Sequence, residues 1–280
     1  MSAILRLSLN VAALDRAAAF YIDALGFKPG AATPLDPAIA AQLGGTAKTL
    51  RLHLGAQEME LVEFATLGRP YPPGSTAADL WFQHLAIVVS DMEAAYAQIR
   101  TQPFTPITEG PPQRLPPSTG SVTAFKFRDP DGHPLELIHF PPGTGAAVWQ
   151  AGHGVFLGID HTAISVADIG RSTKFYAGLG LHQTAHSVNS GPEQARLDGL
   201  AAPVVDVVAL SPSHSPPHVE LLGYRTPRGR PRQDAGPKDI ATTRTVLKSD
   251  RSELLYDPDG HAVLLSPPTD SGNRNATPHP

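Results

Sequence analysis

Histidine and glutamate occupy matching places in repeated segments of this sequence. His84 lies in FQHLAIVVSD and His161 in IDHTAISVAD, each near the start of an alternating strand pattern. Glu60, Glu136 and Glu220 stand before leucine in MELVEF, ELIHF and VELLGY. Imidazole and carboxylate groups can transfer protons or bind cations, although a histidine on the inner face of a strand can also be a hydrogen-bonded wall residue. Because the pattern recurs, these side chains are expected to hold equivalent positions in repeated structural units.

Four repeated units carry these residues, and we number them in chain order. They are unit one (residues 4–64), unit two (82–140), unit three (159–224) and unit four (240–266). Units one to three each show the pattern of a strand, a helix and then antiparallel strands, whereas unit four is too short for the helix. This order predicts an α+β fold of curved mixed sheets and argues against a doubly wound one.

The stretch between units two and three divides the chain. Residues 141–156 are rich in Gly, Ala and Pro and are predicted to be a linker. We therefore expect two domains, residues 1–140 and 157–268, of which the second is degenerate because unit four is truncated. The polar tail at 269–280 is predicted to be disordered.

Two shared motifs set the register between units. The pair FY occurs in the helices of units one and three, and counting back from it places Arg6 level with the histidine of unit three. On the same alignment unit four offers Thr243 and Leu264. A DPDGH turn occurs in units two and four, and we expect its histidines, His133 and His261, to be solvated.

Composition excludes several classes of function. The net charge is −4 with 17% charged residues, which favours neither nucleic acid nor an anionic membrane as a partner. The chain has no cysteine, so disulfides, thiolate metal sites and a cysteine nucleophile are excluded. No stretch reaches the roughly 18 apolar residues of a membrane span, and the N-terminus lacks a signal-peptide pattern, so a cytoplasmic location is expected. No GxGxxG or P-loop motif indicates a nucleotide site.

The repeated units, the FY helix, the DPDGH turn and the closing glutamate together resemble the vicinal oxygen chelate superfamily. That group includes glyoxalase I, ring-cleaving dioxygenases, methylmalonyl-CoA epimerase and bleomycin-resistance proteins. The resemblance implies βαβββ units that pair into a cup and supply metal ligands from their opening and closing strands. Carried onto this sequence with units one and two paired, it implies Glu60, His84 and Glu136 as ligands of a divalent Fe, Mn, Ni, Co or Zn ion. Either glutamate would also serve as a catalytic base.

Arg6 departs from this pattern, because a guanidinium has no lone pair to offer a metal. It is expected either to pair with Glu60 or Glu136, or to bind a substrate carboxylate. Arg114, in the loop GPPQRLPPSTG, is a second candidate for substrate binding at the mouth of the cup.

Two classes of function follow. The first is a metal-dependent enzyme acting on a small oxygenated substrate, similar to a glyoxalase, epimerase or dioxygenase. The second is a metal-free protein that sequesters a small molecule. In the C-terminal pair only His161 and Glu220 match the ligand pattern, so that pair is expected to be structural. Its missing helix leaves a sheet face to be covered by the linker, by the Pro-rich segment Thr226–Pro237 or by a second chain, and the last of these would make a homodimer.

Overall fold

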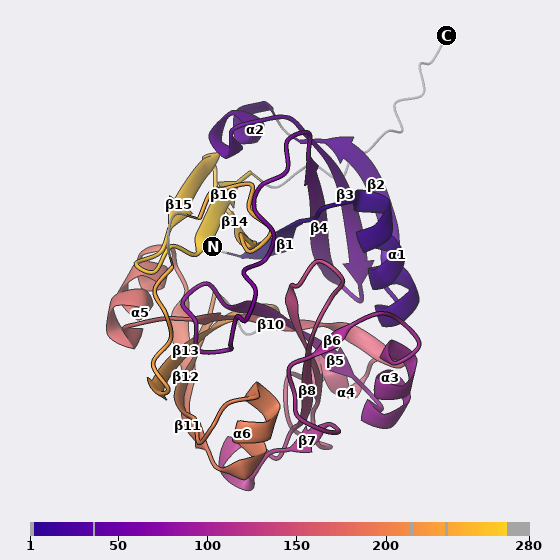
Figure 1. Ribbon diagram of the computed structural model, residues 1–280, viewed down its shortest axis with the longest axis vertical. Helices are drawn as coiled ribbons and strands as arrows, with labels where there is room; N and C mark the ends of the chain where they lie inside the picture. The colour runs from indigo at the N-terminus through magenta and orange to yellow at the C-terminus, as the bar shows by residue number, and fades with distance from the viewer. Residues whose placement is uncertain (1–2, 36, 213–214, 233–234, 268–280) are drawn as a thin grey trace.

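The structure is a computed structural model that describes residues 3–35, 37–212, 215–232 and 235–267, and it forms two curved sheets with helices along their sides (Figure 1). The tail predicted to be disordered lies outside these residues. Sheet A has the strand order β15-β16-β14-β1-β4-β3-β2. Its strands are β1 (Ile4–Asn10), β2 (Lys28–Pro34), β3 (Ala47–Leu54), β4 (Gln57–Phe64), β14 (Arg244–Lys248), β15 (Glu253–Tyr256) and β16 (Ala262–Ser266).

Sheet B has the order β11-β12-β13-β10-β5-β9-β8-β6, and β7 pairs with β8. Its strands are β5 (Gln83–Val89), β6 (Thr105–Pro106), β7 (Gln113–Arg114), β8 (Thr123–Arg128), β9 (Pro134–His139), β10 (Phe156–Ser165), β11 (His182–Ser190), β12 (Val204–Ser211) and β13 (His218–Thr226). The helices are α1 (Leu14–Leu25), α2 (Pro37–Leu43), α3 (Met92–Ile99), α4 (Ala147–Gln150), α5 (Ile169–Gly178) and α6 (Pro192–Asp198), with a 3₁₀ turn at Pro117–Thr119. The α+β class and the curved sheets are as predicted.

The pairing of units differs from the prediction. Strand β1 of unit one pairs antiparallel with β14 of unit four, and β5 of unit two pairs antiparallel with β10 of unit three. Each sheet is therefore built from one unit of each half of the chain. The expectation that units one and two share a cup is wrong, because unit one forms its sheet with unit four and unit two forms its sheet with unit three.

Units one and two meet through one apolar cluster, and units three and four through another, and both clusters include helix residues. One apolar cluster contains buried residues of α1, such as Tyr21, together with Phe125 and Phe127 of unit two. A second cluster joins Leu181 of unit three to Val263 of unit four. Each half of the chain thus has its own apolar core, and each sheet links the two halves.

The sheet face that a fourth helix would cover is already buried. Leu247, Val263 and Leu265 pack in one cluster with Ile169 and Phe175 of α5. Unit three therefore shields unit four within the chain, which removes the reason given for a homodimer. Dimerisation stays a prediction.

Capping residues of the sequence mark the start of α3 and α5 and the end of α1. Asp91 and Asp168 cap α3 and α5 by accepting hydrogen bonds from the backbone nitrogens of Ala94 and Arg171. Helix α1 ends at Gly26, which has φ 69° and closes the last turn with backbone hydrogen bonds. None of the helices described is long and apolar enough to cross a membrane. The cytoplasmic location stays a prediction.

The histidines of the two DPDGH turns are buried, contrary to the expectation that they are solvated. His133 is 1% exposed and lies with Nδ1 2.8 Å from Asp129 Oδ2 and Nε2 3.1 Å from the carbonyl oxygen of Ile240. Burial by itself lowers the pKa of His133, but the Asp129 carboxylate outweighs it and raises that pKa. In unit four, burial lowers the pKa of His261. The histidine of each turn contacts a backbone carbonyl of another part of the chain, Ile240 for His133 and Ser165 for His261, so both turns have a structural role.

Candidate metal and substrate site

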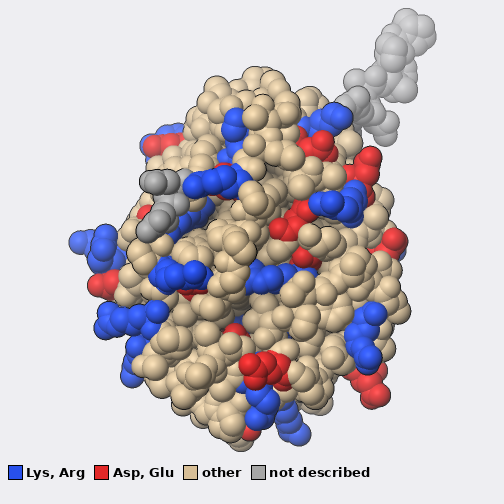
Figure 2. Space-filling view, in the orientation of Figure 1, with Lys and Arg blue, Asp and Glu red and all other residues tan. Residues whose placement is uncertain are grey.

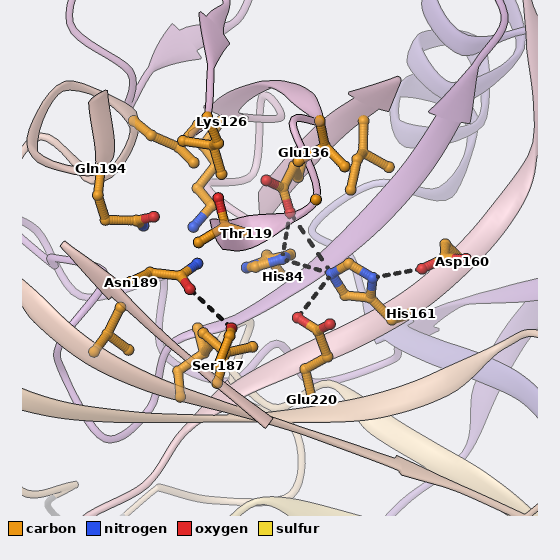
Figure 3. A pocket seen from close by; sticks show the side chains of 18 of the residues that line it. His84, Thr119, Lys126, Glu136, Asp160, His161, Ser187, Asn189, Gln194 and Glu220 are labelled. Atoms are coloured by element: carbon orange, nitrogen blue, oxygen red, sulfur yellow. Dashed lines mark hydrogen bonds and ion pairs between the residues drawn. The ribbon is translucent and has the colours of Figure 1, made fainter. Parts of the chain in front are cut away.

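Four side chains from four strands of sheet B converge at a cavity (Figure 3). His84 comes from β5, Glu136 from β9, His161 from β10 and Glu220 from β13. Glu136 Oε2 lies 2.9 Å from His84 Nε2 and 3.6 Å from His161 Nε2. The two Nε2 atoms are 3.4 Å apart, and Glu220 Oε2 is 3.4 Å from His161 Nε2. Imidazole nitrogens and carboxylate oxygens of two different units thus face one another.

The strand register explains this convergence. On β5 the histidine stands two residues before Ala86, which pairs with the glutamate of β9. On β10 the histidine stands two residues before Ala163, which pairs with the glutamate of β13. Residues two apart on a strand share a face, so each unit presents one histidine and one glutamate to the same side. Pairing of β5 with β10 brings the two sets together.

A buried carboxylate orients one of the histidines. Asp160 Oδ2 lies 2.9 Å from His161 Nδ1, and Asp160 Oδ1 accepts a hydrogen bond of 2.7 Å from Trp149 Nε1. With Nδ1 engaged, His161 directs Nε2 at the cluster. His84 differs, because its buried Nδ1 has no hydrogen-bond partner among the described residues.

The pKa values of the two histidines in the cluster are shifted in opposite directions. Burial lowers the pKa of His84, and Glu136 offsets this only in part. For His161 burial acts in the same direction, but Glu220, Asp160 and Glu136 raise its pKa well above the usual range. Both glutamates are held ionised despite burial. Lys126 and His84 keep the pKa of Glu136 well below its usual range, and the neighbouring histidines lower that of Glu220 to about 2.

This donor set fits a divalent transition-metal ion. One ligand atom from each of His84, Glu136 and His161 lies within 4.8 Å of the other two. Two Nε2 atoms that face each other need a proton or a cation between them, and the ionised glutamates favour a cation. Two imidazoles with carboxylate oxygens suit iron, manganese, nickel, cobalt or zinc. The bond from Asp160 to His161 is the kind of outer support that metal-binding histidines have.

The cluster lies at one side of a cavity of about 340 Å³. Lys126 pairs with Glu136 across β8 and β9 and also lines the cavity, whereas Gln194 and Asn189 lie on its other side (Figure 3). Apolar side chains line the space between, among them Leu115, Val122, Ile138, Val205, Val207 and Leu222. The volume is within the range of small-molecule sites. On the outer face seen in Figure 2, lysine and arginine are interspersed with aspartate and glutamate.

Comparison with known proteins identifies the fold family. The model of the Glyoxalase/Bleomycin resistance protein/Dioxygenase superfamily matches the chain twice, over residues 3–137 and 158–271. The chain belongs to this superfamily. Glyoxalase I from Zea mays is 17% identical over 95% of this chain and 92% of its own, with a TM-score of 0.64. A candidate dioxygenase from Bacillus subtilis subsp. subtilis strain 168 is 13% identical over 95% of this chain and 85% of its own, with a TM-score of 0.56. No curated protein matches the sequence.

Within this superfamily fold, the predicted trio of Glu60, His84 and Glu136 does not come together. Glu60 lies on β4 of sheet A, where its Oε1 accepts a hydrogen bond of 3.2 Å from Arg6 Nε. Its Oε2 accepts one of 3.0 Å from Ser8 Oγ. The expected contact between Arg6 and Glu60 is therefore present, but it lies in the other sheet because unit one pairs with unit four.

Sheet A holds arginines where sheet B of this glyoxalase-superfamily chain holds histidines. Arg244 takes the equivalent position of unit four, one residue beyond the predicted Thr243. It is fully buried and donates to Asn10 Oδ1 at 2.6 Å, and burial lowers its pKa to about 10. Leu264 stands where the alignment placed it and is buried with Ile39 of α2. Buried guanidinium groups and apolar side chains thus replace the ligand set in sheet A.

The remaining predicted residues divide between the cavity and the surface. His161 and Glu220, expected to be an isolated remnant, lie at the cluster instead, which corrects that expectation. Arg114 is exposed and does not line the cavity, whereas its loop neighbours Leu115 and Thr119 do.

One signal in the sequence could have shown which units pair. In units two and three the opening strand carries a histidine and the closing strand a glutamate. The opening strands of units one and four carry an arginine at the place of that histidine. No repeated motif marks Asp160, Lys126 or Gln194.

Proposed function

We propose that this superfamily member is a metal-dependent enzyme in which His84, Glu136, His161 and Glu220 hold one divalent ion. The convergence of two imidazole nitrogens and two carboxylates beside a cavity of about 340 Å³ carries the proposal. When bound, the ion would act as a Lewis acid toward two neighbouring oxygens of a small oxygenated substrate.

The protein's own groups have separate tasks in this proposal. Asp160 and Trp149 hold the His161 ring in one orientation. Glu136, 8% exposed in its side chain, is shielded and stays a ligand. Glu220 is 22% exposed and lies at the cavity, so it is the carboxylate best placed to move a proton to or from a substrate.

Two reaction classes share this set of residues. Two histidines and one carboxylate are the ligands of many non-haem iron oxygenases. The fourth group, Glu220, favours proton transfer next to a carbonyl, as in isomerases and lyases. Exchange of solvent deuterium into α-hydroxy carbonyl compounds, followed by NMR, would support proton transfer. Oxygen consumption by the iron-loaded protein with catechols would support ring cleavage.

Metal analysis tests the proposal directly. Protein purified without a tag or chelator is expected to contain about one divalent ion per chain. His161→Gln should lose that ion, whereas His186→Gln, at an exposed position on β11, should keep it. Equal metal content in the two variants would contradict the proposal.

A metal-free binding protein is the second candidate. The observation in its favour is that Glu136 lies within hydrogen-bond distance of His84. These two side chains can therefore bond to each other without a metal ion. Failure of the wild-type protein to bind cobalt, nickel, zinc or iron in calorimetry would select this candidate.

A further inference from the structure

The wall of the cavity contains a set of charged hydrogen bonds that starts beside Glu136. Lys126 Nζ donates to Asp198 Oδ1 at 2.7 Å, and the two residues are 4% and 2% exposed. Asp198 Oδ2 also accepts from Tyr224 OH at 2.8 Å and from Gln194 Nε2 at 2.7 Å. Asp198 therefore neutralises Lys126 within the wall. A bound anion would have to compete with a carboxylate that three donors already hold.

Gln194 leaves an acceptor without a donor at this wall. Its nitrogen is identified by the bond to the Asp198 carboxylate, so its oxygen points elsewhere. That Oε1 atom is buried and has no hydrogen-bond partner among the described residues. Gln194 lines the cavity and projects toward it (Figure 3). Since the oxygen is shielded from bulk solvent, a group seated in the cavity is the natural source of the missing donor.

Asn189 supplies the complementary donor. Its Oδ1 accepts a hydrogen bond of 2.8 Å from Ser187 Oγ, which leaves its amide nitrogen on the side of the cavity (Figure 3). An acceptor and a donor, both uncharged, thus lie on the wall opposite the metal cluster. Apolar residues such as Val122, Val207 and Leu222 separate the two polar ends.

We propose that the substrate carries an uncharged hydrogen-bonding group, a hydroxyl or a primary amide, on an apolar body, and that Gln194 selects it. This inference rests on the proposed function, which assigns the opposite end of the substrate to the metal. A carboxylate or phosphate at this position would face the Gln194 oxygen, with Lys126 already paired and with Glu136 and Glu220 nearby. The site therefore selects against anionic substrates.

Three hydroxamates that differ in one group test the inference. Benzohydroxamic acid binds divalent metals through two oxygens, and its 4-hydroxymethyl and 4-carboxy derivatives add a neutral or an anionic group at the far end. Calorimetry with the cobalt-loaded protein should show the hydroxymethyl compound binding about tenfold more tightly than the parent, because one buried acceptor gains a donor. The carboxy compound should bind at least about tenfold more weakly than the hydroxymethyl compound.

A pair of glutamine variants assigns the effect. Gln194→Leu should abolish the preference for the hydroxymethyl compound over the parent. Gln183→Leu, at an exposed position on β11, should behave as the wild type. Equal affinities, or tightest binding of the carboxy compound, would overturn the inference while leaving the proposed function intact. Absence of cobalt uptake and of binding by all three compounds would overturn both.

Discussion

Glutamates 60 and 136 occupy equivalent strand positions in different sheets, and replacing each by glutamine separates a structural role from a site role. Glu60 is 4% exposed and accepts hydrogen bonds from Arg6 and Ser8. Loss of the Glu60 charge leaves the guanidinium of Arg6 buried without a carboxylate partner. It also removes the electrostatic stabilisation that Glu60 gives to the charged form of Arg244. Removing one partner of a buried ion pair costs about 3–5 kcal/mol, and we expect the lower value because glutamine keeps one acceptor oxygen.

Thermal unfolding followed by circular dichroism measures this cost. At about 2–4 °C per kcal/mol for a chain of this size, the midpoint of Glu60→Gln should fall by roughly 6–12 °C. Its metal content should equal that of the wild type. Glu136→Gln should lose metal affinity by at least about 100-fold, since even an outer-shell partner is worth roughly 10–100-fold.

A third variant serves as the control for the ion pair. Joint replacement of Arg6 and Glu60 by methionine removes both charges, and such apolar replacements are often neutral or stabilising. The double variant should therefore unfold at a higher temperature than Glu60→Gln. If Glu60→Gln strips the metal and leaves the unfolding midpoint unchanged, Glu60 is a ligand and the assignment of the site to sheet B is refuted.

Three further predictions concern the support of the site, the pH dependence of stability and the joining of the halves. Asp160→Asn should weaken metal affinity by roughly 10–100-fold, measured by competition with a chromogenic chelator, because His161 loses its orienting carboxylate; unchanged affinity would contradict this role. The pKa of His133 is raised in the folded state, so its stabilising effect is complete below about pH 6.5 and is lost as the pH rises through the folded value, at up to about 1.4 kcal/mol per pH unit. Urea titrations from pH 6 to 9 should show this loss in the wild type and a flatter profile in His133→Gln. Cleavage at a protease site inserted between the exposed residues His153 and Gly154 should leave both fragments together on size exclusion; their separation would show that the sheets do not join the halves.

Local features of this fold were predictable because each depends on residues close together in the chain. The FY helix marks units one and three, the DPDGH turn marks units two and four, and the closing glutamate marks units one to three, so most of the register within a unit followed from the sequence. His84 and Glu136 belong to one unit and were expected to lie close together, and their side chains are 2.9 Å apart. The choice of partner was missed, because it shows only in the histidine that the opening strands of units two and three share and in the arginine that those of units one and four share. Glu60 was therefore assigned to the wrong sheet.

The contacts and burial of single side chains were predicted only where they depend on chemical type and not on which units pair. Arg6 could not be a ligand on chemical grounds alone, and its contact with Glu60 followed from charge. Burial of His133 was missed because its partner, the carbonyl of Ile240, comes from a unit distant in the sequence. The Lys126–Asp198 ion pair likewise joins two units, because Lys126 lies on β8 and Asp198 on α6, 72 residues apart in the sequence.

The joining of β5 to β10 has a consequence for how the protein is made. During synthesis the first half emerges with its histidine and glutamate in place, but β5 then has an open edge that β10 has yet to fill. The second half must arrive and pair before Glu136 meets His161. A nascent or truncated first half therefore lacks His161 and Glu220, so the proposed binding at the cluster would arise only when both halves have docked. Ligand uptake would then report that folding is finished, and a half-made chain would be unable to carry out the reaction prematurely.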